Sequence, residues 1–369
     1  MSVPRHVPEA AALCRYLEGV LGAPVGDVTV SALGGGPSGA DLKRFGYGTP
    51  LRIDCTVGRT PRRFVLARQR VQPGYGHDYP SDRAQAALWG HDAYNRLPRH
   101  VASRDVGFLL DSGALVSVAG WRDAFQLVDF SEGTEYRRDL ERIADARALG
   151  PEDLDRVDAL AAYLAEIHRE RHDAPHIYHR RIRELVGHGE CIMGVLDGYP
   201  EAFALLPPVE REAIERAAVS WRWRLRGRVD RLATTHGDFH PWNILFRTGT
   251  DFTLLDRSRG EWGEPADDVA ALVVNYLFFA LVSEGRFRGP LRVCFERFLD
   301  RYLDATGDAE LFEVLPPFLL FRGLVLASPK WYPTLDDGVR RSLLGLVRRM
   351  AEPGPFDPAA VEASLEGRR

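Results

Sequence analysis

Lysine is almost absent from this chain of 369 residues. Of its 48 basic residues only Lys43 and Lys330 are lysines, and all the others are arginines. A skew of that size reflects genome composition rather than the chemistry of single sites. The absence of a lysine from any one position therefore excludes less here than it does in an average sequence.

Cysteines and long apolar runs are also scarce. The four cysteines lie far apart with no CxxC pair, which excludes a disulfide framework and a cysteine-based zinc site. The longest apolar run, residues 269–282, contains Asn275 and falls short of the ~20 residues that cross a bilayer. The first residues lack the pattern of a signal peptide. We therefore expect free thiols in a reducing cytoplasm, a buried core helix at 269–282 and no membrane partner.

Charge of one sign is not in excess either, because the formal net charge is only -4. Without a basic surplus, nucleic acid is not an expected partner. What the chain does have is an ordinary globular composition, with 45% hydrophobic and 27% charged residues. Its length suffices for two packed lobes.

The first third of the chain has the alternating pattern of strands. A helix is expected at residues 10–21, and strands at 28–33, 40–45, 51–57 and 63–68, with a glycine-rich turn at 34–39. Ser81 or Asp82 is suited to cap a helix that runs to about residue 97. Two more strands, at 106–110 and 114–119, precede the segment 125–130. Together these elements predict a small antiparallel sheet with one main helix.

The remainder of the chain has a helical period. Segments 136–148, 151–171, 177–196 and 208–225 are long enough and suitably spaced for helices. A sheet-rich first part before a mainly helical second part predicts an α+β fold of two lobes, residues 1–127 and 128–369. The hinge is expected at residues 128–133. The oligomeric state cannot be derived from this pattern.

One stretch, residues 232–256, places chemically useful side chains close together. It contains the sequence His236-Gly237-Asp238, then Asn243, and at the end of an apolar strand Asp256. Phosphoryl transfer from a nucleotide needs a group that orients the attacking hydroxyl and oxygen ligands for Mg²⁺. Asp238 suits the first role, and Asn243 with Asp256 suits the second.

A second segment, residues 263–270, reads Gly-Glu-Pro-Ala-Asp-Asp-Val-Ala. With the first, it resembles the aminoglycoside phosphotransferase and choline kinase-like family, whose catalytic loop reads His-Gly-Asp, four residues and Asn, with a metal-binding Asp downstream. The resemblance extends over about residues 33–282. It implies a protein kinase-like fold, Asp238 as the catalytic residue, and Asn243 and Asp256 as ligands of Mg²⁺.

The same resemblance implies a nucleotide site. The glycine-rich turn becomes a loop that covers the phosphates of ATP or GTP, and the hinge contacts the nucleotide. The residues concerned are Gly35, Gly36, Ser38, Gly39 and Val128.

At the phosphate-binding lysine the chain departs from the family. Arg68 stands where that lysine is expected, and its planar, longer head makes the exchange non-neutral. Lys43 is an alternative cation for the phosphates. The family usually has an acidic partner for the phosphate-binding cation on the small lobe's helix. That partner is assigned to Asp82, with Gln85 as an uncharged alternative, although Asp82 also suits a helix cap.

Two further residues are assigned to support the loop rather than to react. His236 precedes the catalytic aspartate and is expected to hold the loop in place. Asp268 lies ahead of the apolar helix and is expected either to cap that helix or to brace the loop. By the resemblance, His168 packs at the end of its helix.

The acceptor is less clearly indicated. His240 and Trp242 lie inside the catalytic loop, where an aromatic ring either stacks on a substrate or wedges the loop against the core. Glu261 and Asp267 offer negative charge to a cationic acceptor, whereas Arg257 and Arg259 oppose it. A charged helix face with Arg180 and Arg181 is either a binding surface or simply solvated.

These observations predict a small-molecule kinase that transfers the γ-phosphate of Mg-ATP, or of GTP, to a hydroxyl of a sugar, an amino sugar or an amino alcohol. The alternative is a kinase-fold protein that binds nucleotide, regulates a partner and has little activity, which the departure at Arg68 favours. A protein kinase is disfavoured because only residues 257–264 separate Asp256 from the next motif, too few for that family's activation loop.

Overall fold

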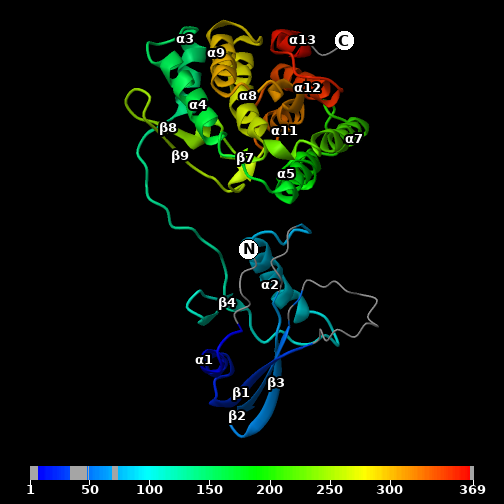
Figure 1. Ribbon diagram of the computed structural model, residues 1–369. Coiled ribbons are helices and arrows are strands. Elements are labelled where there is room, and N and C mark those ends of the chain that lie inside the picture. The colour runs from blue at the N-terminus through cyan, green and yellow to red at the C-terminus, as the bar shows by residue number, and fades with distance from the viewer. Residues whose placement is uncertain (1–6, 34–47, 49, 69–73, 366–369) are drawn as a thin grey trace. The chain divides into compact units, whose positions relative to one another are not determined.

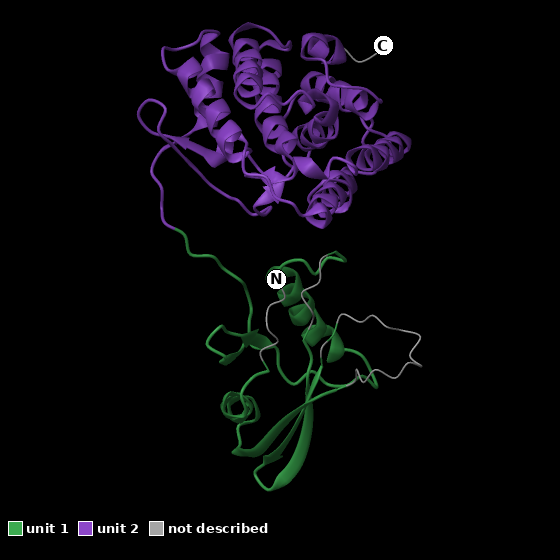
Figure 2. Cartoon of the chain, viewed as in Figure 1, with its two compact units in different colours: residues 1–128 green, residues 129–369 purple. Residues whose placement is uncertain are grey.

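The computed structural model describes residues 7–33, 48, 50–68 and 74–365. The chain divides into two compact units, Met1–Val128 and Asp129–Arg369 (Figure 2). The division predicted from the sequence placed the boundary one residue earlier, after Leu127. The predicted strand at 40–45 lies outside the described residues.

The described part of the N-terminal unit contains small antiparallel sheets and the helices α1 and α2 (Figure 1). Strands β1, β2 and β3 form one sheet in that order, and β4 and β5 form a separate pair. The bounds are α1 Ala10–Leu21, β1 Val25–Ala32, β2 Leu51–Val57, β3 Thr60–Leu66, α2 Pro80–Tyr94, β4 Gly107–Leu109 and β5 Leu115–Ser117.

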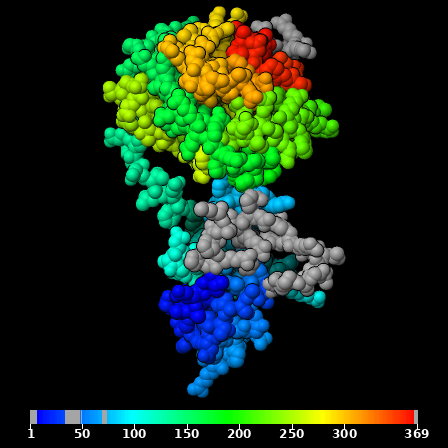
Figure 3. All heavy atoms as spheres, in the orientation of Figure 1, coloured from blue at the N-terminus to red at the C-terminus, as the bar shows by residue number. Residues whose placement is uncertain are grey.

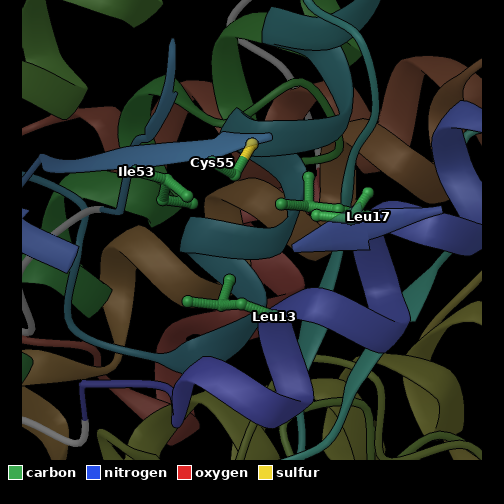
Figure 4. Close-up of a cluster of buried hydrophobic side chains, with 5 residues drawn as sticks. Leu13, Leu17, Ile53 and Cys55 are labelled. Carbon is green, nitrogen blue, oxygen red and sulfur yellow. The ribbon is translucent and has the colours of Figure 1, made fainter. Parts of the chain in front are cut away.

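The core of this unit is small. Leu13 and Leu17 of α1 pack with Ile53 and Cys55 of β2 (Figure 4). Alternate residues of β2 are buried, as expected for a strand with one face on a core. By contrast α2, the predicted main helix, has no buried residue among those described.

The C-terminal unit is mostly helical. Its helices are α3 Tyr136–Ala146, α4 Asp153–Ile167, α5 Pro175–Gly187, α6 Ile192–Asp197, α7 Pro208–Leu225, α8 Pro265–Glu284, α9 Gly289–Thr306, α10 Leu311–Val314, α11 Pro316–Ala327, α12 Asp337–Ala351 and α13 Val361–Leu365. Short 3-10 turns stand at Val229–Arg231 (η1), Pro241–Asn243 (η2) and Pro358–Ala360 (η3). With the sheets, this is the predicted α+β composition.

Helix α8 forms the centre of this unit. The side chain of Glu264 accepts a hydrogen bond from Ala266 N and caps the helix start, and Gly285, at φ 65°, ends it. Among the described residues, α8 is long enough and apolar enough to cross a membrane. However, 83% of its most apolar segment is buried inside the unit. Such burial is that of the core helix expected at 269–282, and no membrane protein is indicated.

Helix α9 covers one side of α8 and has two faces. Its buried face carries Leu291, Phe295, Phe298 and Tyr302. Its polar face lies at the surface, where atoms of this part of the chain are orange in Figure 3. This is the amphipathic pattern that the helical period predicts for a helix at the surface of a core.

One predicted helix differs from the structure. The single helix expected at 177–196 is two helices, because the chain breaks at a glycine-rich link: a Cβ at Gly194 would stand 2.0 Å from the carbonyl oxygen of Gly189. Only glycine permits so close an approach of two backbone segments. The segment 125–130, which follows the predicted strands, lies in no helix or strand, and Phe125 is 93% exposed.

Five short strands hold the loops of the site. β6 Thr134–Glu135, β8 Ile244–Phe246 and β9 Phe252–Leu254 form an antiparallel sheet in that order, and β7 Ala233–Thr234 pairs with β10 Trp262–Gly263. The loop predicted to be catalytic joins β7 to β8. Asp256 follows β9.

Candidate functional site

The catalytic loop is closed at its base by a fully buried carboxylate. Asp268, in the first turn of α8, accepts hydrogen bonds from the backbone N of His236 and of Gly237, each at 2.7 Å. His168 Nε2 lies 3.2 Å from the same carboxylate, and His168 Nδ1 lies 2.8 Å from the hydroxyl of Tyr302. Asp268 therefore braces the loop, and Glu264 takes the role of helix cap.

The pKa of Asp268 shows how firmly it is bound. Burial on its own would raise this pKa, but the hydrogen bond and charge of His168, together with His236, hold it below the usual value. A buried carboxylate that receives this many donors stays ionised. Helix α8 and the catalytic loop are thus joined by charge-assisted hydrogen bonds.

His236 faces inward. It is 4% exposed, and its Nδ1 accepts a hydrogen bond from Asp238 N at 3.2 Å. Burial lowers the pKa of its ring, against the opposing effects of Asp268 and Asp238. Gly237 follows at φ 86°, a left-handed conformation that favours glycine. This turn points the next residue, Asp238, away from the brace.

Asp238 is paired with a residue that the sequence reasoning missed. Arg322 of α11 donates from Nη1 to Asp238 Oδ1, from Nη2 to Gly237 O at 3.1 Å, and from Nη2 to Asp267 Oδ1 at 2.8 Å. The Arg322 side chain is only 8% exposed. The sequence did carry a signal for this pairing: Arg322 is the only charged residue in the apolar segment 316–327, and a buried charge requires partners.

The charges of this pair are mutually stabilised. Burial would raise the pKa of Asp238, but the hydrogen bond from His240 and the charge of Arg322 hold it well below its usual range. Burial would lower the pKa of Arg322, and the carboxylates of Asp267 and Asp238 raise it instead. Asp238 is therefore an ionised acceptor at neutral pH, suited to orient a hydroxyl rather than to store a proton.

Asn243 and Asp256 lie at the neighbouring ends of β8 and β9. Asn243 Nδ2 donates to Asp238 O at 3.1 Å, and Leu255 N donates to Asn243 O at 2.9 Å. A continuous chain of hydrogen bonds thus joins Asp238, Asn243 and the residue before Asp256. Asp256 has φ 53° and its Oδ1 accepts from Ser258 N at 3.2 Å.

The oxygen chemistry of this pair fits Mg²⁺. The Asn243 amide donates through its nitrogen, which leaves its oxygen for a cation, and the Asp256 carboxylate is exposed to solvent. Among the described residues no three His, Cys, Asp or Glu side chains form a metal-holding cluster. Two oxygen ligands are what Mg²⁺ takes from a protein when phosphates and water complete its shell.

A cavity of about 230 Å³ adjoins Asp256 in this unit. It is lined by Tyr163, Ile167, Thr234, Thr235, His236, Leu254, Leu255, Asp256 and Arg257. Most of this lining comes from β7, β9 and their following residues. The cavity therefore lies between α4 and the segments that follow β7 and β9.

The two aromatic residues of the loop differ in their surroundings. His240 Nε2 lies 3.5 Å from Asp238 Oδ2, and its Nδ1 accepts from Trp242 N. Trp242 stacks on Phe279 of α8, with ring centroids 5.9 Å apart. Of the two roles expected for an aromatic ring here, Trp242 has the contacts of a wedge against the core.

The predicted acidic acceptor groups also differ. Asp267 is engaged by Arg322. Glu261 has an exposed side chain, and its backbone oxygen accepts from Thr235 N and Arg257 Nη2. Its main chain, rather than its carboxylate, is bonded to the loop.

Several predicted nucleotide-site residues belong to the N-terminal unit. Gly35, Gly36, Ser38, Gly39 and Lys43 lie outside the described residues. Arg68 stands just after β3, Val128 is the last residue of the unit, and Asp82 Oδ2 accepts from Tyr79 N at 2.8 Å in the first turn of α2. Asp82 thus has the helix-capping contact that its position predicted. A role for these residues toward nucleotide stays a prediction.

Solved structures that match this chain include several small-molecule kinases. An ethanolamine kinase from Plasmodium vivax is 12% identical, with 92% of this chain and 80% of that chain covered and a TM-score of 0.35. An amicoumacin kinase is 13% identical, covering 90% and 91%, with a TM-score of 0.42. Values this low do not transfer an acceptor to this chain. No curated protein matches it.

The sequence itself matches a family model. The model described as "Phosphotransferase enzyme family" covers residues 56–317, which is more than half of the chain and includes the catalytic loop, Asp256 and α8. This confirms the resemblance, the kinase-like fold class and the enzyme class expected from the sequence. The chain belongs to the phosphotransferase enzyme family and is an ATP-dependent phosphotransferase that acts on hydroxyl groups.

Proposed function

We propose that this enzyme transfers the γ-phosphoryl group of Mg-ATP to a hydroxyl of a small metabolite, with Asp238 as the catalytic residue. The observation that carries the proposal is the hydrogen-bonded chain from Asp238 through Asn243 to Leu255, which ends beside Asp256. It holds the carboxylate that orients the substrate hydroxyl and the two oxygen ligands of Mg²⁺ in a fixed order.

In this proposal Asp238 accepts a hydrogen bond from the acceptor hydroxyl and aligns it for attack. Its pKa, held down chiefly by His240 and Arg322, keeps the carboxylate ionised for that task. Asn243 and Asp256 hold Mg²⁺, which neutralises charge on the phosphates when it is bound. Positioning and charge neutralisation supply the catalysis, and no covalent intermediate is required.

The N-terminal unit supplies the nucleotide contacts in the proposal. Segment 35–39 covers the phosphates, Arg68 or Lys43 contributes the cation, and Asp82 and Val128 complete the site. Either ATP or GTP suits these groups. A sugar, an amino sugar or an amino alcohol is the class of acceptor, and four free cysteines suit a reducing cytoplasm.

The test is a metabolite screen with nucleotide consumption as the readout, run with and without Mg²⁺. The proposal predicts consumption that requires Mg²⁺ and is stimulated by a hydroxyl-bearing compound. Stimulation by the same compound after its hydroxyl is replaced by hydrogen would contradict it.

The competing function is a nucleotide-binding regulatory protein with little catalysis. Arg68 favours it, and so does the ion pair that engages Asp238. A melting-temperature measurement with Mg-nucleotide separates the two when it is followed by the acceptor screen. A rise in melting temperature without turnover across a broad panel would favour the regulatory protein.

A further inference from the structure

We propose that the acceptor carries an acid group, and that Arg259, assisted by Arg181, binds it beside Asp238. The inference rests on the proposed function, because it names the substrate class of that site. It begins from the charged side chains around Gly237.

Arg259 lies directly over the catalytic turn. A Cβ placed on Gly237 would stand 3.0 Å from the Arg259 Cβ and 3.8 Å from the Arg181 Nη2. The positive charge of Arg259 also contributes to the low pKa of Asp238. Both guanidinium groups are therefore within reach of a small molecule whose hydroxyl contacts Asp238.

The Arg259 guanidinium is held in place without a carboxylate. Its Cζ lies 5.2 Å from the ring centroid of Phe321, and its Nη1 lies 3.6 Å from Cys191 Sγ. Burial raises the pKa of that thiol to about 11, so Cys191 stays neutral at physiological pH. Among the residues that the structure describes, no carboxylate forms an ion pair with Arg259. A half-buried guanidinium that lacks a counter-charge favours an anionic ligand.

The neighbouring carboxylates are already engaged. Asp267 and Asp238 share Arg322. Glu184 is shared by Arg180, at 2.6 Å, and by Arg181, at 3.0 Å. Arg259, by contrast, contacts the ring of Phe321 and the neutral thiol of Cys191, and no ion pair with a carboxylate is found for it among the described residues.

This balance disfavours an amine on the acceptor near Arg259. An ammonium group placed there would lie beside a guanidinium, and the carboxylates of Asp238, Asp267 and Glu184 are already paired with arginines. A carboxylate or phosphate instead accepts the fork of Arg259 in two parallel hydrogen bonds. We therefore expect hydroxy acids or phosphorylated alcohols as acceptors, rather than amino sugars or amino alcohols.

The transferring phosphoryl group is a second source of the same chemistry. Arg259 would then stabilise the nucleotide's γ-phosphate during transfer, and its loss would slow nucleotide hydrolysis in the absence of any acceptor. If Arg259 recognises the acceptor instead, the loss of Arg259 raises the KM for the acceptor more than it slows that hydrolysis.

The experiment compares three groups of probes with wild-type protein and Arg259→Gln. Glycerate and gluconate represent acids, their amides represent matched neutral compounds, and ethanolamine and glucosamine represent cations. Arg216→Gln is the control, because Arg216 pairs with Glu212 on the exposed face of α7. Nucleotide consumption is measured with and without each probe, and the melting temperature is measured with each probe alone.

The proposal predicts that the acids are preferred over their amides, and that Arg259→Gln raises the KM for acids about tenfold or more. It also predicts that Arg216→Gln keeps the wild-type KM and the wild-type rate of acceptor-independent hydrolysis. A preference for the cations would overturn it, and so would slower hydrolysis in Arg259→Gln with an unchanged KM.

The melting temperatures separate this proposal from the proposed function. If no probe stimulates consumption but acids raise the melting temperature only while Arg259 is present, the acid site stands and the kinase proposal is contradicted. If probes stimulate nucleotide consumption, but acids raise neither the consumption nor the melting temperature more than their amides do, the acid site is overturned and the kinase proposal stands.

Discussion

The two sides of the catalytic loop differ in the burial and the hydrogen bonding of their aspartates. On the inner side Asp268 is fully buried and every contact of its carboxylate is to the protein, through His168, His236 and Gly237. On the outer side Asp256 is exposed, and its carboxylate accepts a hydrogen bond from Ser258 N. The comparison teaches that the aspartates of two neighbouring motifs have different roles: Asp268, whose hydrogen bonds are satisfied, holds the loop, and Asp256, which is exposed, is available to a cation.

The largest expected effect comes from the inner side. Asp268→Ala leaves two buried backbone N–H groups without acceptors and His168 without its partner, so we expect the free energy of unfolding to fall by roughly 3 kcal/mol or more. Denaturant unfolding measures this. Asp268→Asn, which keeps one acceptor oxygen, is the matched control and should lose less. If Asp256→Asn lost as much stability as Asp268→Ala, the contrast between the two sides would be contradicted.

A somewhat smaller loss is expected where the two sides meet. Arg322→Met leaves Asp238 and Asp267 without their shared cation, which we expect to cost about 2 kcal/mol, because Asp238 is 17% exposed and regains some water. The pKa of Asp238 should also rise toward its usual value. Arg322→Lys should retain more stability. Unchanged stability in Arg322→Met would show that the ion pair does not hold the loop.

The outer side should respond in function and not in stability. Asp256→Asn is expected to change the free energy of unfolding by less than about 0.5 kcal/mol. The Mg²⁺ concentration at half-maximal turnover should rise by at least about tenfold, because a charged oxygen ligand is lost. A Mg²⁺ titration of turnover tests this, with Asp251→Asn on the exposed loop after β8 as control. An unchanged Mg²⁺ requirement would remove Asp256 from the metal site.

The smallest effect is a pH dependence on the inner side. Burial lowers the pKa of His236 below its ordinary 6.5, so the unfolded chain binds the proton more readily. The stability that neutral His236 contributes is therefore present above pH 6.5 and is lost as the pH falls below it. Unfolding measured from about pH 7 to about pH 5 should show a shallower loss in His236→Asn than in wild type. Parallel pH curves would contradict this assignment.

Local signals were enough to predict much of the fold. The helices expected at 10–21 and 208–225 are α1 and α7, and their ends carry local signals: Gly22, in a left-handed conformation, follows α1, and Pro208 begins α7. The break between α5 and α6 was missed, because it depends on the contact of Gly194 with Gly189 rather than on local propensity.

The site divides in the same way. The motifs placed Asp238, Asn243 and Asp256 on adjacent loops, because those residues are close in sequence. Arg322 lies 84 residues after Asp238, and no local pattern pairs them. The balance of charge at Arg259 depends on α5, α11 and the loop after β9 together, so only the folded chain reveals it.

The central claim is that Asp238 performs the chemistry on the open side of a loop that Asp268 holds. The most direct test is the turnover of Asp238→Asn, since Asn keeps the oxygen that accepts from Arg322 and so preserves the loop. We predict that turnover falls below about a tenth of the wild-type rate while the affinity for Mg-nucleotide stays nearly unchanged. Retention of more than about a tenth of the rate would contradict the claim.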